Sequence, residues 1–445
     1  MINSTLPLPG LSPVSSKSVV ATFDGGLLSS DGGVLMLREV EQRLRIADRF
    51  AGCIEDQRAP DQITHALADI IRFRLLMIAA GYEDGNDANG LRVDPIFKMA
   101  LDLSPSDREL CSQSTISRIE NVPDARALLR MGRAMVDLHC ESFRQVPKRI
   151  VLDIDDTFDA VHGGQQLRLF NALTTNTVSS RLSCSTAKAA SSRLCFAPPN
   201  GRVARRFAPS CAACCGRSGP TGPTPRYCCA PTAIIAVRKS STGVEPMVSI
   251  ISWASRRPRR CAGTSRASRP ARRRASRPRR RKARRAASRS SSTGPPAEPR
   301  RADRRPCGGQ RGRADTRFIV TNLKVRNARV LYEDVYCRRG QAENHIKSWK
   351  THLAADRTSC TKATANQLRL FLHAGAYWLM WGLRVSMPRR SMWRVAQFDT
   401  LRLRLINVAA RVVERKTMIR IHLPTSCPAQ DILRLVLGRI PRLVT

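Results

Sequence analysis

A short segment near residue 340 carries the residue types and spacing best suited to chemistry. Intervals of two, three and six residues separate four of them: Tyr336, Arg339, Glu343 and Lys350. On one helix, expected over 330–350, steps of three and four residues place these positions on a shared face with Lys347. A carboxylate among cations can bind a metal ion beside groups that bind phosphate. The alternative is a solvated helix with ordinary ion pairs, and spacing alone favours that alternative.

A second candidate lies at the end of an expected strand over 149–155 (RIVLDID). Apolar residues at every second position are typical of a mostly buried strand. The strand ends in acidic residues, and Asp155 lies two residues before Thr157. This segment therefore places carboxylates at the end of a strand, where a rigid element can hold them.

The composition changes abruptly between Leu173 and Ala314. This block contains 33 Arg or Lys but only three acidic residues, together with nine Cys and 15 Pro. The flanking sequence contains 43 basic and 32 acidic residues, and most of the net charge of +41 therefore lies in the block. Residues 256–289 are almost devoid of apolar side chains, so they cannot offset the entropy of ordering, and we expect the block to be disordered.

We interpret the block as the product of a shifted reading frame. In the displaced frame, the first base of a visible codon becomes the middle base of a hidden codon, so a visible stretch rich in Cys and Ser conceals an apolar one. With a suitable choice of third bases, the hidden sequence over 225–235 reads EILLRADSHY, a buried strand ending in an acid whose codon straddles Pro231 and Thr232. The choice of bases is ours, and the polar and apolar pattern depends on it much less than the single residues do. One lost base near Leu173 and a compensating change near Arg313 account for both edges. The alternative is a genuine basic, disordered insert. The sequence leaves open whether the shift itself is a mutation, a sequencing error or programmed recoding.

These residues together resemble a known family. The spacing is similar to the Y-(2)-R-(3)-E-(6)-K signature of bacterial insertion-sequence DDE transposases, and YCRRGQAENHIKSWK resembles a subgroup of the DDE group-1 elements. The sequence LDIDDTFDAVHG resembles the first catalytic strand of that subgroup, and its metal-binding Asp corresponds to Asp155. The hidden ADSHY resembles the segment with the second catalytic Asp, which the visible chain lacks. The resemblance covers about 20–172 and 315–445.

The resemblance implies an α/β (α+β) chain with an RNase H-like catalytic domain and a helical N-terminal domain. It implies two Mg²⁺ (or Mn²⁺) ions, about 4 Å apart, that stabilise the attacking and leaving oxygens of phosphoryl transfer. Asp155 would bridge both ions and Glu343 would hold one. The DNA-binding residues would be those on the signature face: Tyr336, Arg339, Lys347 and Lys350. The implied partners are double-stranded DNA, both terminal repeats and target, and a second copy at the element ends.

The expected domains follow the composition and the resemblance. They are a flexible lead (1–20), a helical DNA-binding domain (21–148), the first part of the catalytic domain (149–172), the basic block (173–314), and the rest of the catalytic domain with C-terminal helices (315–445). Within them, residues 112–121 (SQSTISRIEN) are either a recognition helix or, more commonly for such a segment, solvated surface.

Several smaller elements are also expected. Apolar residues at helical spacing predict a helix over 63–78, with Asp61 as a cap after Pro60. The sequence further predicts a polar loop over 81–90, a strand over 318–323, helices over 367–384 and 393–415, and a Pro-containing tail. Cys residues at 211, 214, 215, 228 and 229 resemble a zinc site only superficially, because the block contains no His.

Charge and cysteine usage indicate the compartment and the partner. The flanks alone are strongly basic, which favours nucleic acid, although a soluble basic protein without such a partner is the alternative. No window contains the ~18 uninterrupted apolar residues of a membrane span, since Arg369 and His373 interrupt the nearest one. With no secretory signal, 15 Cys favour a reducing compartment. We therefore expect a cytoplasmic, nucleoid-associated protein that is not bound to a membrane.

The sequence thus predicts a transposase that binds element ends and catalyses metal-dependent cleavage and strand transfer. Because the second catalytic Asp is lost, we expect this copy to be inactive. Two alternatives remain open: a non-catalytic protein whose Arg-rich block binds DNA by counterion release, and a regulatory relic whose N-terminal region occupies terminal repeats.

Overall fold

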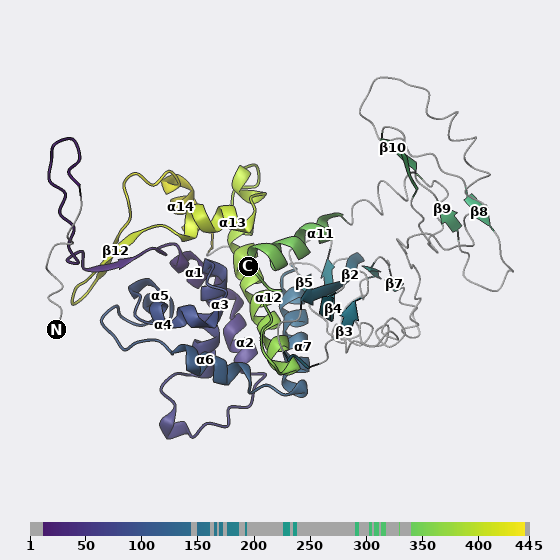
Figure 1. Cartoon of the computed structure of the whole chain (residues 1–445), viewed down its shortest axis with the longest axis horizontal. Helices are drawn as coiled ribbons and strands as arrows, with labels where there is room; N and C mark the ends of the chain where they lie inside the picture. The colour runs from purple at the N-terminus through teal and green to yellow at the C-terminus, as the bar shows by residue number, and fades with distance from the viewer. Residues whose placement is uncertain are drawn as a thin grey trace. The chain divides into compact units, whose positions relative to one another are not determined.

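The computed structural model describes two long stretches of the chain, residues 12–143 and 340–440, and short segments between them (Figure 1). The intervening described segments are 149–160, 164–166, 169–171, 176–186, 192–193, 226–231, 235–237, 290–292, 302–304, 307–310, 313–316 and residue 329. The expected strand over 318–323 lies outside the described residues.

The chain divides into two compact units that do not follow the expected domain boundaries. Unit 1 comprises 1–131, 348–355 and 364–445, and unit 2 comprises 132–347 and 356–363. The C-terminal segment therefore folds with the N-terminal helices, although the resemblance assigned it to the catalytic domain. The boundary passes through α7 (Ala125–Glu141).

The N-terminal part of unit 1 is helical, as expected. Its α-helices are α1 (Val34–Leu44), α2 (Ile46–Ala51), α3 (Leu67–Ala80), α4 (Ala88–Leu91), α5 (Pro95–Ala100) and α6 (Gln113–Glu120). Two 3₁₀ turns, η1 (Pro60–Gln62) and η2 (Gly85–Asp87), lie between them. The helix expected from Ile63 therefore begins only at Leu67, because Pro60 starts a separate turn. The expected loop over 81–90 contains η2 and the start of α4.

Two apolar helices form the centre of unit 1. Nearly every residue of α3 is buried, and so is most of α12 (Ala363–Ser386), which confirms the helix expected over 367–384. The helices approach closely at Gly375, where an added Cβ would lie 2.7 Å from Leu75. Phe50 of α2 meets Phe371 of α12 edge to face. Figure 1 shows α12, in green, beside the purple N-terminal helices.

A three-stranded sheet joins the two ends of the chain in unit 1. Strand β12 (Ala410–Glu414) lies between β1 (Leu27–Ser29) and β13 (Ile419–His422), and both pairings are antiparallel. The basic helix expected over 393–415 is therefore wrong in its second half. Ala410 and Val412 are both 3% exposed while Arg411 is exposed, and this alternation is the period of a strand.

Short elements replace the rest of that expected helix and the expected tail. They are a 3₁₀ turn (Met392–Arg394), α13 (Phe398–Leu401), a π-helical turn η8 (Arg402–Ile406) and α14 (Gln430–Leu437). The tail thus contains both β13 and a helix, because Leu433 and Val436 of α14 are buried at a helical interval of three residues. The periodicity of the sequence did not reveal these breaks.

Unit 2 contains a mixed sheet around the expected acidic strand. Strand β2 (Arg149–Ala160) confirms and extends the expected strand over 149–155. The sheet order is β3-β4-β2-β6-β7, with β5 on β4. Their bounds are β3 (Leu169–Asn171), β4 (Asn176–Thr186), β5 (Ser192–Arg193), β6 (Arg226–Pro231) and β7 (Ile235–Val237). Strand β2 is antiparallel to β4 and parallel to β6.

Strands β4 to β11 fall within or at the edge of the basic block, so the predicted disorder does not describe those segments. The later ones form two hairpins: β8 (Ser290–Ser292) with β9 (Ala302–Arg304), and β10 (Cys307–Gln310) with β11 (Arg313–Thr316). The Arg-rich stretch 256–289 lies outside the described residues. The chain as described is therefore mixed α and β, and helices dominate its two long stretches.

No helix in the described ranges is long and apolar enough to cross a membrane. The segment with Arg369 and His373 belongs instead to α12, where His373 is buried.

Candidate active site

The first expected catalytic residue, Asp155, lies on the central strand of the mixed sheet. In the antiparallel pairing of β2 with β4, Asp155 is the partner of Ser183. Alternation along β2 places Asp155 on the same face as Asp153 and on the opposite face from Ile154. The first half of the strand is rich in β-branched and apolar residues, and alternation gives Asp153, Asp155 and Asp159 positions on one face and Asp156 a position on the other.

Strand β6 is the parallel neighbour of β2 and ends beside the middle of that strand. Its last residue, Pro231, is the partner of Ile154, while β2 continues to Ala160. Paired positions share a face of the sheet, so Pro231 is on the face of Ile154 and one position short of Asp155 in the register. Proline has no side-chain donor or acceptor, and the visible sequence therefore supplies no polar group at Pro231.

The other expected catalytic residue, Glu343, lies on α11 (Gly340–Lys347), a helix of unit 2 that contacts β4. Lys347 is four residues further along the same helix and is exposed. Residues four apart share a helix face, so Glu343 and Lys347 are neighbours on α11. Tyr336 and Arg339 lie outside the described residues, and their expected roles stay predictions.

The signature helix does not continue as an α-helix to Lys350. It ends at Lys347, and Ser348–His352 form a π-helical turn, η6, which belongs to unit 1. A π-turn needs more residues per turn than an α-helix, so Lys350 leaves the face predicted from steps of three and four. Trp349 is 2% exposed and Leu353 is 1% exposed, so both are core residues. Their burial explains why the turn departs from the α-helical period.

A polar clamp fixes the end of this turn. His352 Nδ1 bonds the carboxylate of Asp399, and Arg402 Nη2 donates to the His352 carbonyl at 2.5 Å. Arg402 also reaches Asp399 Oδ1 at 3.2 Å and the Ala79 carbonyl at 3.3 Å. Burial lowers the pKa of Arg402, and Asp399 partly opposes that shift. Sequence reasoning missed this clamp because its residues lie about 50 positions apart.

A buried ion cluster holds α6, the candidate recognition helix, against α12. Arg369 Nε donates to Glu120 Oε2 at 2.7 Å, and Arg74 Nε lies 3.7 Å from Glu120 Oε1. Glu120 is only 2% exposed, so both arginines serve to neutralise a buried charge. The opposite side of α6 exposes Ser114 and Arg118. Both roles proposed for α6, base recognition and solvated surface, fit this orientation.

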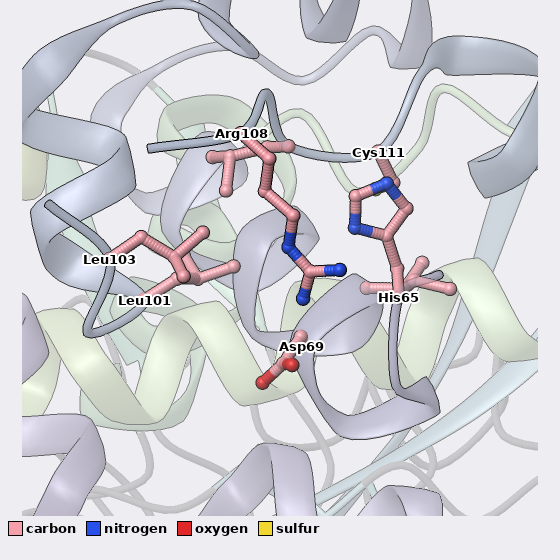
Figure 2. Close-up of a pocket in the computed structure, with 8 residues that line it drawn as sticks. His65, Asp69, Leu101, Leu103, Arg108 and Cys111 are labelled. Carbon is pink, nitrogen blue, oxygen red and sulfur yellow. The ribbon is translucent and has the colours of Figure 1, made fainter. Parts of the chain in front are cut away.

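Figure 2 shows a pocket beside α3 that combines charged and apolar side chains. Burial lowers the pKa of His65, and Arg108 and Arg92 add to that effect. Burial also raises the pKa of the Cys111 thiol to about 12, so the thiol stays protonated and is a poor nucleophile. The pocket therefore contains no activated cysteine.

The described side chains include no group of three or more His, Cys, Asp or Glu that could hold a metal ion. They do not include the side chains of Asp155 and Glu343. Carboxylate oxygens are the donors that Mg²⁺ prefers, so these two residues suit such an ion.

A central strand with carboxylates, next to a helix with a carboxylate and cations, suits an enzyme of phosphoryl transfer. The chain matches the family model described as Transposase DDE domain group 1 over residues 11–178 and 267–445. It therefore belongs to this family of DDE transposases, which act in DNA transposition and generally use divalent metal ions. No curated protein matches the chain.

The limits of the match fall inside the basic block. The unmatched stretch, 179–266, lies entirely within 173–314. The family match resumes at residue 267. Composition placed the C-terminal end of the basic block later, near Arg313.

Proposed function

We propose that this chain descends from a transposase of a bacterial insertion sequence, and that this copy is catalytically inactive. The intact ancestor would bind the ends of its element and carry out metal-dependent cleavage and strand transfer. It would act as a homodimer on the element ends, in the cytoplasm and associated with the nucleoid. Membership of the DDE transposase family carries the general activity.

The topology of unit 2 supports an RNase H-like catalytic domain. Strand β2 carries Asp155 at the centre of the sheet, with an antiparallel neighbour on one side and a parallel neighbour on the other. Helix α11 brings Glu343 to the sheet through its contact with β4. These placements give each candidate carboxylate a rigid support.

Each residue has a specific role in this proposal. Asp155 and Glu343 hold divalent ions, and bound ions of this kind stabilise the attacking and leaving oxygens of phosphoryl transfer. The phenol and cations of the signature, Tyr336, Arg339, Lys347 and Lys350, orient the phosphates or bases of the DNA end. The His352 clamp supports Lys350 by fixing the turn to which it belongs.

The inactivity rests on the loss of the second catalytic Asp. Strand β6 ends at Pro231, one position short of Asp155 in the register, and in the displaced reading frame the codon that straddles Pro231 and Thr232 encodes Asp when the third base of the Pro231 codon is G. A displaced codon at the end of this strand is therefore our candidate for the lost metal ligand. Two carboxylates cannot fix two ions, so catalysis should nearly vanish.

A cleavage assay tests this proposal directly. The chain is incubated with DNA carrying the element's ends and with Mg²⁺ or Mn²⁺, and we expect no cleavage. In a repaired gene, the base lost near codon 173 is restored and the compensating change near codon 313 is reversed. We expect the protein from this gene to cleave the DNA. In the repaired protein, Asp155→Asn and Glu343→Gln should each abolish it. Ordinary cleavage by the unrepaired chain contradicts the proposal.

Resequencing the gene across codons 170 to 316 distinguishes between the possible origins of the basic block. Stop codons in the displaced frame, or a displaced frame without apolar stretches, would refute the frameshift and leave a genuine basic insert. A restored base near codon 173 would show an error in the sequence, while an unchanged gene would favour mutation or programmed recoding.

The charge of the block favours one further candidate, a non-catalytic DNA-binding protein. Such a protein binds DNA without sequence preference and with a steep salt dependence, because Arg and Lys release counterions from the phosphates. A regulatory relic would instead bind terminal repeats selectively, and that binding would survive deletion of residues 173–314.

A further inference from the structure

The hairpin of β12 and β13 is a basic surface that the proposed active site does not use. Residues 410–422 contain one acid and four cations: Arg411, Arg415, Lys416 and Arg420. All four cations are exposed. No residue in the described part of the chain forms an ion pair with any of them. The hairpin thus presents positive charge that the fold itself does not neutralise.

The strand register separates these cations from the single acid. Arg411 pairs with His422, and Val413 pairs with Arg420, so alternation places Arg411, Arg415 and Arg420 on one face, while Lys416 lies in the turn between the strands. Glu414 lies on the other face, and its Oε2 accepts a hydrogen bond from the Ser106 amide at 2.9 Å. The acid is therefore held against the body of unit 1, while the outer face is left without a carboxylate.

The other face anchors the hairpin in unit 1. Ala410 and Val412 are buried there, and an added Cβ on Gly32 would lie 2.9 Å from the Ala410 Cβ. Paired hydrogen bonds between Arg415 and Met418 close the tip, which leaves Lys416 at the turn. Strand β1 pairs with β12 only at Ala410–Val412, so beyond Val412 the outer face lies on a two-stranded ribbon.

We propose that the outer face of this hairpin binds duplex DNA. The inference deepens the proposed function by assigning its nucleic-acid partner to a particular surface of unit 1. A two-stranded ribbon fits the major groove of B-DNA, which is about 12 Å wide. Arg411 and Arg415 are four strand positions apart, about 13.6 Å, which equals four base-pair rises of about 3.4 Å, so these outward cations can reach separate phosphates.

Lysine footprinting on the full chain tests this surface without any mutation. Acetylation of Lys416 is measured by mass spectrometry with and without a 30-base-pair duplex, in EDTA. We expect the duplex to slow acetylation of Lys416 at least threefold and to leave that of Lys17, an exposed lysine outside the hairpin, unchanged. Equal rates at Lys416 with and without DNA overturn the proposal. Equal protection by phosphatidylserine vesicles also overturns it, because the partner would then be an anionic membrane.

A charge-matched pair of variants measures the contribution to affinity. The triple variant Arg411→Ala, Arg415→Ala, Arg420→Ala is compared with Arg389→Ala, Arg390→Ala, Arg404→Ala, which removes three exposed arginines elsewhere in unit 1. Each lost phosphate contact lowers the salt slope of log K by about 0.9, so the hairpin variant should lose about 3 in slope. An equal loss in the control would show that only net charge matters.

The binding test stays separate from the test of catalysis. It needs no metal ion and no repaired frame, so absent cleavage by the repaired protein leaves the hairpin result intact. Tryptophan fluorescence of each variant, compared with the parent chain, establishes that unit 1 is folded. Lys416 protection in the parent chain decides the proposal even where a variant fails to fold.

Discussion

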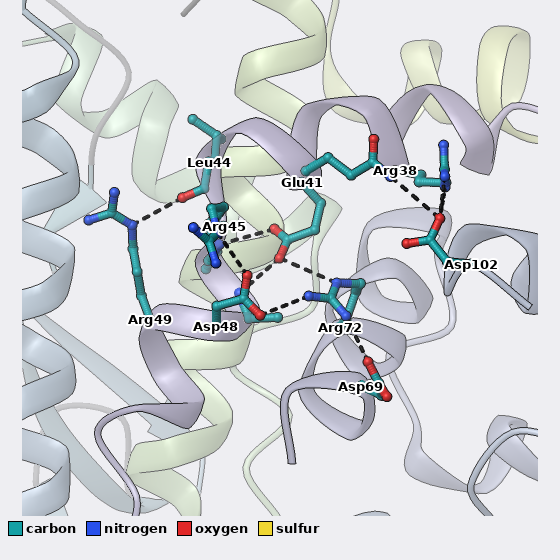
Figure 3. Close-up of polar contacts among 12 residues, drawn as sticks. Arg38, Glu41, Leu44, Arg45, Asp48, Arg49, Asp69, Arg72 and Asp102 are labelled. Atoms are coloured by element: carbon teal, nitrogen blue, oxygen red, sulfur yellow. Dashed lines mark hydrogen bonds and ion pairs between the residues drawn. The ribbon is translucent and has the colours of Figure 1, made fainter. Parts of the chain in front are cut away.

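At the scale of single residues, unit 1 buries several charges and neutralises each in a different way. Glu41 is completely buried and accepts hydrogen bonds from the amides of Ala47 and Ile46 at 2.9 and 3.3 Å. Figure 3 shows Arg72 between Glu41, Asp48 and Asp69. Burial raises the pKa of Glu41 to about 7, against the opposing effects of the Ala47 amide and Arg72. The carboxyl of Glu41 therefore titrates near neutral pH in the folded protein.

This shift predicts a pH dependence of stability. The folded state holds the Glu41 proton up to about pH 7, while the unfolded chain releases it near pH 4.5. The associated stability is complete below pH 4.5 and is lost as pH rises through 7, because the folded state binds the extra proton. Between pH 4.5 and 8 the parent should lose about 3 kcal/mol more unfolding free energy than Glu41→Gln.

Urea unfolding followed by tryptophan fluorescence measures this difference. Four of the five tryptophans, Trp349, Trp378, Trp381 and Trp393, belong to unit 1, so the signal follows that unit. The Glu41→Gln variant keeps all the other titrating groups, so the difference between its pH profile and that of the parent reports on Glu41. Parallel pH profiles for the two proteins would rule out a titrating Glu41.

At the scale of elements, close approach of backbone segments decides how unit 1 closes. Gly33 lies just before α1 and donates its amide to the Ile406 carbonyl at 3.0 Å. Asp31 is completely buried and accepts hydrogen bonds from Tyr82 Oη at 2.8 Å and Asn407 Nδ2 at 2.7 Å. The turn before α1 thus joins the loop after α3 to the segment after η8.

Two glycine-to-alanine variants, one at the contact and one away from it, test its importance. A Cβ on Gly33 would lie 1.8 Å from the Leu405 carbonyl oxygen, so Gly33→Ala must displace backbone and should destabilise unit 1 by at least 1–3 kcal/mol. At Gly90, in α4, nothing lies within 4 Å of an added Cβ. Gly90→Ala should therefore stabilise the unit by about 0.5–1 kcal/mol, because alanine favours the helix. We expect the urea midpoint of Gly33→Ala to lie below that of the parent and the midpoint of Gly90→Ala to lie above it. Similar midpoints for the two variants would contradict this prediction.

At the scale of the whole molecule, unit 1 is made from both ends of the chain. Strand β1 pairs with β12, and Arg43 donates to the Ile440 carbonyl. Arg369 of α12 meets Glu120 of α6 across 249 positions. The N-terminal helices therefore bury their apolar faces against residues that come more than 200 positions later.

Truncation tests this dependence. Removing residues 398–445 deletes β12, β13, α13 and α14, and exposes apolar surface on α3 and α12. We expect the shortened chain to lose cooperative unfolding and to become insoluble. Removing only 441–445 should leave the unfolding midpoint unchanged. A soluble, cooperatively folded product of the longer truncation would show that the N-terminal helices and α12 fold without residues 398–445.

Local patterns in the sequence indicated some features correctly. Alternation of apolar residues predicted β2, because burial imposes a period of two on a strand. The high content of large apolar residues predicted α12, because a helix buried on most sides needs apolar side chains all round. The spacing of the Glu343 signature and the Asp155 strand pointed to the transposase family, to which the family match assigns the chain. The frameshift, the metal ligands and the DNA-binding roles of the signature stay predictions.

Tertiary structure alone decided the remaining features. Apolar residues run through the whole stretch over 393–415 and do not show where the period changes, and pairing with β1 and β13 makes Ala410–Glu414 a strand. The π-turn at Lys350 follows from burial of Trp349 and from the His352 clamp, whose partners lie far away in sequence. The basic hairpin becomes visible only when the register places its cations on one face. Long-range contacts override weak local preference, so these features could not be derived from neighbouring residues.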